Sequence, residues 1–179
     1  MKVALDHDVP ISYMQRTRDY YAALGFETPY RWAHYADVPF TPLSKPLARS
    51  RLALITTAAP YQPGAGDQGP GASYNAAAKF YTVYTDSTDS APDPRISHVG
   101  YDRKHTHARD LNTWFPLERL RETVKAGRVG AITPSFYGSP TNRSQRVTIE
   151  RDAPRLLELC QADAADVALI VPKIGRAHV

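Results

Sequence analysis

Short apolar runs alternate with amphipathic segments over most of the chain. Four of these runs are candidates for strands: residues 51–57, 96–101, 129–133 and 167–171. A continuous apolar run of this length is typical of a strand that is buried on both faces of a parallel sheet. We therefore expect the four segments to be neighbouring parallel strands of one sheet.

Two segments between the later strands have the spacing of amphipathic helices. In the first, apolar residues recur at i, i+3 and i+7: Leu117, Leu120 and Val124. Pro116 in its first turn and Gly127 after it are start and stop signals. In the second, Asp152 is the candidate N-cap, and the apolar positions are Ala153, Leu156, Leu157 and Cys160. The alternation predicts a Rossmann-like α/β domain with a mainly parallel sheet and flanking helices.

Residues 1–50 differ from the rest because they are rich in aromatic residues and prolines. Residues 11–24 have nearly helical spacing, and Gly25 is placed to end the helix. The prolines that follow exclude regular structure, so we expect an extended arm that packs on the core. The predicted organisation is a helix and arm over residues 1–50 and an α/β domain over residues 51–173.

The composition is that of a globular chain able to bury a core. Of the 179 residues 42% are hydrophobic, and the formal net charge is +4 with charges interspersed along the chain. This suits a small anionic ligand at least as well as nucleic acid, and an ordinary solvated surface explains it too. The single cysteine excludes an internal disulfide framework and a multi-cysteine zinc site. We expect a soluble, cytoplasmic protein without nucleic-acid or membrane partners, because no signal peptide or membrane span is found.

The loops that follow the predicted strands carry most of the chemistry. In open α/β sheets ligands bind beyond the carboxyl ends of the strands. Residues 58–79 are rich in glycine and proline, but they match neither a Walker loop nor the dinucleotide fingerprint, so we predict no cofactor. The loop after residues 96–101 contains Asp102, Arg103 and His105, and the polar stretch 137–146 follows residues 129–133.

A metal site and an anion site compete for the histidine-rich loop. The residues that could bind zinc or iron are His98, Asp102, His105 and His107. However, His105 and His107 are two apart in a loop, unlike the HExxH arrangement, and we predict no metal. A general acid or base, His105, beside an anion clamp of Arg103 and Arg143 fits the chemistry better. The alternative that Asp102 and Arg103 pair with each other or cap the next segment stays open.

Long stretches of the chain resemble a known family. They include DVPISYMQRTRDYYAALGF, PYRWAHYADVPFTPLSKPL, ISHVGYDRKHT and FYGSPTNRSQRVTIERDAPRLLELC. Together, over residues 8–172, they resemble the selenoprotein B family of glycine, sarcosine, betaine and D-proline reductases, and more closely its cysteine-containing bacterial relatives. The resemblance implies a selenocysteine or cysteine at the carboxyl end of a strand. It also implies an amino-acid-like substrate, reductive C–N cleavage, a dithiol electron donor and, in some members, a pyruvoyl group on a partner subunit.

The chain departs from that pattern after Pro172. There the resemblance places the redox segment, whereas this sequence continues as KIGRAHV. Residues 174–179 match the translation of a common sequencing adapter, so we expect an N-terminal fragment that lacks the nucleophile. Cys160 is not its substitute, because it lies on the apolar stripe of a predicted helix, where a small buried thiol is expected.

The resemblance gives the polar stretch 137–146 a role beside the missing thiol. Arg143 would bind a substrate carboxylate and lower the pKa of a neighbouring thiol. The predicted substrate-binding residues are Asp102, Arg103, Tyr137, Thr141, Asn142, Arg143 and Ser144. In the alternative, Thr141 and Asn142 cap the next helix and Arg143 is solvated. A non-catalytic amino-acid-binding or subunit-interface module is the alternative function.

Overall fold

The computed structural model describes residues 12–28, 36–37, 40–64, 74–97, 109–140 and 144–172. The chain forms two compact units, residues 1–35 and 36–179. The first contains helix α1, Tyr13–Ala23, and Gly25 follows it with a left-handed φ of 85°, as its predicted end. In the second unit, the ring of Phe40 is 87% exposed, so this part of the predicted arm does not pack on the core.

A mixed sheet, mostly parallel, organises the second unit. Its strands are β1 (Arg51–Thr56), β2 (Tyr84–Ser87), β3 (Ala131–Ile132), β4 (Ser135–Gly138) and β5 (Val167–Val171). β5 pairs in parallel with β1 along its whole length. On the other edge of β1, β3 pairs with its first half and β4 with its second half, both in parallel. β2 pairs with β4 in the antiparallel direction.

β1 is buried on both faces, as its apolar run predicted. Leu52 and Leu54 belong to a large cluster on one face of the sheet. Ala53 and Ile55 belong to a smaller cluster on the opposite face. Because successive side chains of a strand point to opposite faces, a strand covered on both sides needs apolar residues at every position.

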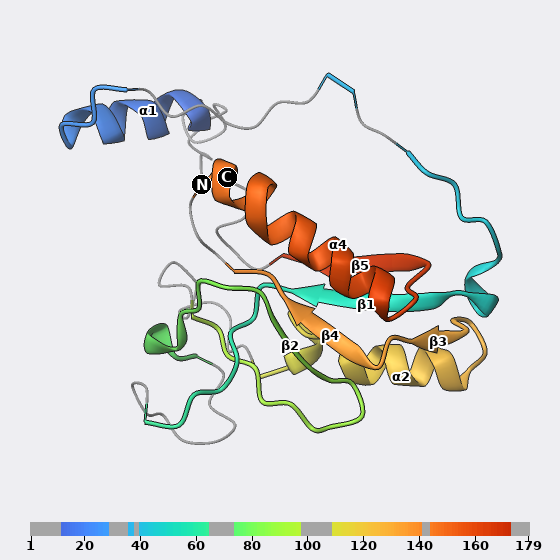
Figure 1. Cartoon of the computed structure of the whole chain (residues 1–179). Helices are drawn as coiled ribbons and strands as arrows, with labels where there is room; N and C mark the ends of the chain where they lie inside the picture. The colour runs from blue at the N-terminus through green and yellow to red at the C-terminus, as the bar shows by residue number, and fades with distance from the viewer. Residues whose placement is uncertain are drawn as a thin grey trace, which may run out of the picture. The chain divides into compact units, whose positions relative to one another are not determined.

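Helices α2 (Leu117–Lys125) and α4 (Ala153–Ala162) cover the two faces of this sheet (Figure 1). Leu117 and Leu120 of α2 pack into the cluster that contains Leu54. Leu156 and Cys160 of α4 pack on the face that contains Ile55. The predicted α/β fold, with a mainly parallel sheet and flanking helices, is confirmed.

The helix before β5 begins earlier than predicted. A short helix α3 (Gln145–Val147), a π-helical turn (Thr148–Asp152) and α4 follow one another directly. Ser144 is the N-cap, since its Oγ accepts a hydrogen bond from the Val147 amide at 3.3 Å. Asp152 has helical dihedral angles (φ −75°, ψ −42°), so its predicted role as N-cap is wrong.

Two loop and strand predictions also need correction. Tyr137 and Gly138 belong to β4, so the polar loop begins after them. In the predicted strand 96–101, Ile96 forms an isolated parallel bridge with Tyr74, next to the antiparallel bridge of Arg95 with Ala59. Residues 98–101 lie outside the described residues. The polar strand β2 was not predicted, because YTDS has no apolar run.

The ring of Tyr84 covers Gly138 across the β2–β4 pair. The two residues are register partners, and a Cβ added to Gly138 would lie 1.8 Å from Cε1 of Tyr84. We therefore expect Gly138→Ala to lower the free energy of unfolding by about 1–3 kcal/mol, because the ring must shift in a packed site. Urea denaturation followed by circular dichroism measures this change.

A double-mutant cycle with Tyr84→Ala is the control for this contact. In the absence of the ring, Gly138→Ala should cost much less than in the parent chain, so the two changes should be strongly non-additive. Additive costs would show that the close approach of Tyr84 to Gly138 does not decide the choice of glycine.

Candidate functional site

Three neighbouring strands end at the same edge of the sheet. Thr56 at the end of β1 is the register partner of Val171 in β5 and of Gly138 in β4. Just beyond the strands, the Ser139 amide donates to the Thr56 carbonyl at 2.7 Å. The segments that leave β1, β4 and β5 therefore start side by side, at the edge where ligands bind in open α/β sheets.

The backbone that leaves β1 is fixed by buried hydrogen bonds. The Thr56 hydroxyl donates to the Trp114 carbonyl at 3.2 Å and accepts from the Ala58 amide at 3.0 Å. The Tyr84 hydroxyl donates to the Ala58 carbonyl at 2.8 Å. Thr56 and Ala58 are fully buried, so these bonds hold the start of the glycine-rich loop without help from solvent.

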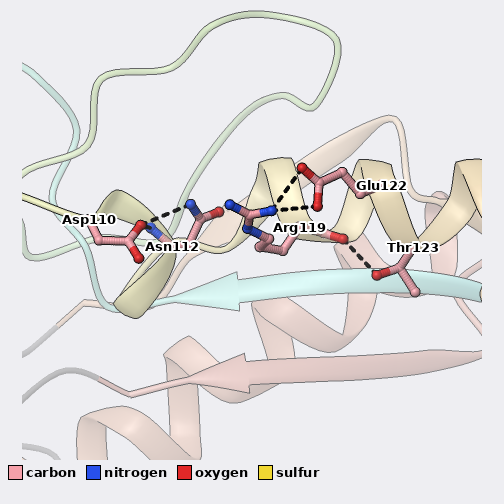
Figure 2. A network of polar contacts seen from close by, with 5 residues as sticks. All are labelled: Asp110, Asn112, Arg119, Glu122 and Thr123. Carbon is pink, nitrogen blue, oxygen red and sulfur yellow. Dashed lines mark hydrogen bonds and ion pairs between the residues drawn. The ribbon is translucent and has the colours of Figure 1, made fainter.

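A polar network stabilises the segment that leads into α2 (Figure 2). Asp110 caps a short 3-10 turn (Leu111–Thr113), accepting from the side chain and the amide of Asn112 at 2.9 and 3.0 Å. These hydrogen bonds, with a smaller contribution from Arg119, hold the pKa of Asp110 below its usual value. Arg119 in turn donates to both carboxylate oxygens of Glu122, at 2.9 and 2.7 Å. Trp114 directly follows this turn, and its carbonyl accepts the hydrogen bond from the Thr56 hydroxyl at the end of β1.

Arg95 is a buried cation beside the start of the glycine-rich loop that follows β1, and the sequence analysis did not identify it. Its side chain forms an ion pair with Asp93 at 2.7 Å, and its guanidinium lies 4.5 Å from the centre of the Tyr61 ring. Its backbone exchanges hydrogen bonds with Ala59 at 2.7 and 2.9 Å. A buried guanidinium is retained only where such contacts compensate its lost hydration. In the sequence it is one more arginine in a polar stretch, so no local signal marks it.

Tyr137, a predicted substrate-binding residue, lies in the core of the sheet. Its hydroxyl donates to the carboxylate of Asp163, just after α4, at 2.6 Å. Burial first, and then this hydrogen bond, raises the pKa of Tyr137 far above its usual value. The hydroxyl is thus engaged within the protein, and a role of Tyr137 in substrate binding stays a prediction.

Ser144 is the other predicted site residue that the structure describes. It is half-buried and caps the helix after β4, which ties the carboxyl end of the polar loop to a fixed point. The remaining site predictions lie outside the described residues: Asp102, Arg103, His105, Thr141, Asn142 and Arg143, together with His98 and His107 of the weighed metal site. Within the described ranges no group of three or more histidine, cysteine or acidic residues could hold a metal ion.

Asp152 is a buried carboxylate that the sequence interpretation misplaced as a cap. It ends the π-helical turn and accepts from Nε of Arg151 at 3.0 Å. Arg151 also donates to the Tyr81 carbonyl at 2.9 Å. A π-turn shifts the phase of a helix and is frequent at functional sites. No periodicity signal reveals such an inserted turn, because the residues on either side keep ordinary helical spacing.

Cys160 is a packing residue of α4. Its half-buried thiol contacts the cluster of Ala53, Ile55 and Tyr137. Burial first, and then the negative charge of Asp163, raises the pKa of the thiol. A nucleophilic cysteine needs the opposite shift, so this agrees with the expectation of a structural thiol.

The chain is similar to two subunits of amino-acid reductases. It is 26% identical over 142 residues to D-proline reductase subunit gamma of Acetoanaerobium sticklandii, and the aligned region covers 78% of this chain and 55% of that protein. It is 23% identical over 150 residues to glycine reductase complex component B subunit gamma of Symbiobacterium thermophilum, and this aligned region covers 84% of this chain and 34% of that protein. The chain is a homologue of reductase gamma subunits. The resemblance to the selenoprotein B family is confirmed.

The chain spans about half the length of the first relative and about a third of the second. No protein-family model matches the chain, and no solved structure matches it significantly. Among the helices in the described part, none is long and apolar enough to cross a membrane.

Tyr137→Phe tests the buried link between β4 and α4. The change removes one hydroxyl that donates to a carboxylate, so we expect the free energy of unfolding to fall by about 1–2 kcal/mol. Tyr81→Phe is the matched control, because that side chain is 64% exposed and its loss of a hydroxyl should leave stability unchanged. Urea denaturation of the three proteins measures the difference, and equal stabilities would show that the Tyr137–Asp163 hydrogen bond contributes nothing.

Proposed function

We propose that the chain is the substrate-binding, N-terminal part of a thiol- or selenol-dependent reductase that cleaves a C–N bond of an amino acid or related compound. The similarity to the two reductase gamma subunits, over 78% and 84% of the chain, carries this proposal. In the proposed reaction a dithiol supplies two electrons and two protons. The C–N bond is replaced by a C–H and an N–H bond, and the dithiol becomes a disulfide.

The sheet edge described above supports the proposed position of the site. The loop after β4 is tied at one end by the Ser139–Thr56 hydrogen bond and at the other by the Ser144 cap. Only Thr56 of β1 lies between the start of this loop and Val171, the residue near which the resemblance expects the cysteine or selenocysteine. A loop anchored at both ends can present side chains to that position at little entropic cost.

We assign the roles at this site from the residue types. Arg143 binds the substrate carboxylate through two parallel hydrogen bonds, and Thr141, Asn142 and Ser144 bind its other polar groups. Asp102 and Arg103 complete the polar surface, and His105 serves as acid or base. The chain itself needs no cofactor in this scheme.

Partner subunits belong to the same proposal. The relatives are by name a subunit of D-proline reductase and a component of a glycine reductase complex. We propose a partner reductase subunit, which in some members of the family carries a pyruvoyl group, and a dithiol electron donor in the cytoplasm.

A non-catalytic amino-acid-binding or subunit-interface module is the second candidate. It is compatible with the half-buried, structural thiol of Cys160, whose pKa is raised by burial. The two candidates are separated by the reading frame of the source gene beyond Pro172. A frame that continues into a cysteine or selenocysteine supports the reductase, and one that continues without either supports binding alone.

Arg143→Lys in the full-length protein tests the carboxylate site. Lysine keeps the charge but loses the planar, bidentate contact, so kcat/KM for a carboxylate substrate should fall roughly 10- to 100-fold. The thermal midpoint should change little, because the proposed contact is made to the substrate. Steady-state kinetics and thermal denaturation of the same preparations measure both quantities.

Arg128→Lys is the matched control. Arg128 is exposed, between α2 and β3, at the amino ends of the strands and therefore far from the proposed site. Near-parental kinetics for both variants, in a protein whose activity depends on the downstream thiol, would remove Arg143 from the site.

A further inference from the structure

We propose that Arg95 is a positioning residue of the candidate site. It aligns the glycine-rich loop that leaves β1 with the segment that leads along the chain to His105. We call the described residues that meet around it the loop base: residues 58–61, 74–75 and 95–97. The contacts of the loop base are features of the fold, whereas the claim that they serve the site rests on the proposed function.

Backbone hydrogen bonds fasten the glycine-rich loop at two points to one short segment. Ala59 and Arg95 exchange two hydrogen bonds, at 2.9 and 2.7 Å. The carbonyl of the next residue, Ile96, accepts from the Asn75 amide at 2.9 Å, beside the bridge of Ile96 with Tyr74. The chain therefore leaves this segment at Ala59 and returns to it at Tyr74.

The side chain of Arg95 adds a third point of attachment. It is 1% exposed, forms an ion pair with Asp93 at 2.7 Å, and places its guanidinium 4.5 Å from the centre of the Tyr61 ring. The attraction between a cation and the face of an aromatic ring is stronger where water is excluded. Arg95 thus holds Ala59 through its backbone and Tyr61 through its side chain.

The loop base is fixed to the carboxyl end of β1 and to the core. The Ala58 amide donates to the Thr56 hydroxyl at 3.0 Å. Ile96 belongs to the large core cluster, and Ser97 is buried. His105, the proposed acid or base, follows Ser97 along the chain. A shift of the loop base would therefore move the starting points of both loops relative to the strand ends.

A guanidinium at this position suits alignment better than it suits stability. An apolar side chain of similar size would fill the same space without losing hydration, and buried ion pairs often contribute little net stability. A lysine would keep the charge, but it lacks the planar group that lies against a ring while it donates to a carboxylate. Alignment of the loop requires the fixed directions toward Tyr61 and Asp93 that the guanidinium of Arg95 supplies.

The test changes the ring, because substitution of the buried Arg95 would disturb the fold itself. In the full-length protein, Tyr61→Leu removes the aromatic face and Tyr61→Phe keeps it. We expect the amides of Ala59 and Asn75 to exchange with solvent about 10- to 30-fold faster in Tyr61→Leu, because the loop base opens locally. In Tyr61→Phe both amides should exchange at the parental rate.

Val124→Ala is the matched control for stability. Val124 packs on the large core cluster from α2, near the end of the helix that leads to β3 and the start of β1. We expect this change and Tyr61→Leu each to lower the thermal midpoint by about 2–5 °C. Val124→Ala should nevertheless leave the two amides of the loop base at the parental exchange rate, because local opening there does not disturb α2.

Steady-state kinetics, at a temperature where all four proteins are folded, test the link to the site. We expect kcat/KM for an amino-acid substrate to fall about 10-fold in Tyr61→Leu, since small misplacements of reacting groups slow turnover strongly. Tyr61→Phe and Val124→Ala should keep the parental value.

Two results would overturn the inference. The first is an exchange rate of both amides in Tyr61→Leu that equals that of the parent or of Val124→Ala, which would show that the ring contact of Arg95 does not hold the loop base. The second is fast exchange with parental kcat/KM, which would make Arg95 a structural residue only. Absence of turnover in the parental protein would instead refute the proposed function, and the exchange rates alone would then decide whether Arg95 holds the loop base.

Discussion

The burial of β1 on both faces and both edges is the constraint on which the second unit depends. Every other strand except β2 pairs directly with β1, and both helices that cover the sheet pack on its side chains. Its carboxyl end also fixes the loops around the candidate site through the backbone and hydroxyl of Thr56. Between the exposed Arg51 at its start and Thr56 at its end, a strand in this position tolerates no polar side chain, which explains the sequence LALI.

The parts of the fold that sequence patterns predicted are those that burial alone determines. The apolar run of β1 and the stripe of α2 are of this kind, because both are buried. The run of β5 was also predicted to be a strand, but Ala168 and Ile170 on one of its faces are exposed. The start of the helix at Ser144, the strand β2 and the isolated bridges near Arg95 were missed for a different reason. The Ser144 cap is a single hydrogen bond to Val147, and β2 and the bridges near Arg95 join residues far apart in the sequence, so the apolar pattern contains no record of them.

The candidate site follows the same division. The general rule for parallel sheets predicts it at the carboxyl edge, where β1, β4 and β5 end together. The supporting residues could not be found in this way. Arg95 and Asp152 are buried charges whose ion pairs are local, with Asp93 and Arg151. The Tyr61 ring beside Arg95 and the Tyr81 carbonyl that binds Arg151 come from distant segments, which no local pattern reveals. Because the residues after it are polar, the sequence analysis placed Tyr137 in a loop. Its hydroxyl in fact donates to the Asp163 carboxylate within the folded domain.

The π-helical turn at Thr148–Asp152 divides one continuous helix into two parts with different phases. The first part is oriented by the Ser144 cap and the loop after β4, and the second by the packing of Leu156 and Cys160 on the sheet. The extra residue in the turn lets each part adopt the rotation that its own contacts require. The loop end of this helix can therefore change its rotation without repacking the sheet.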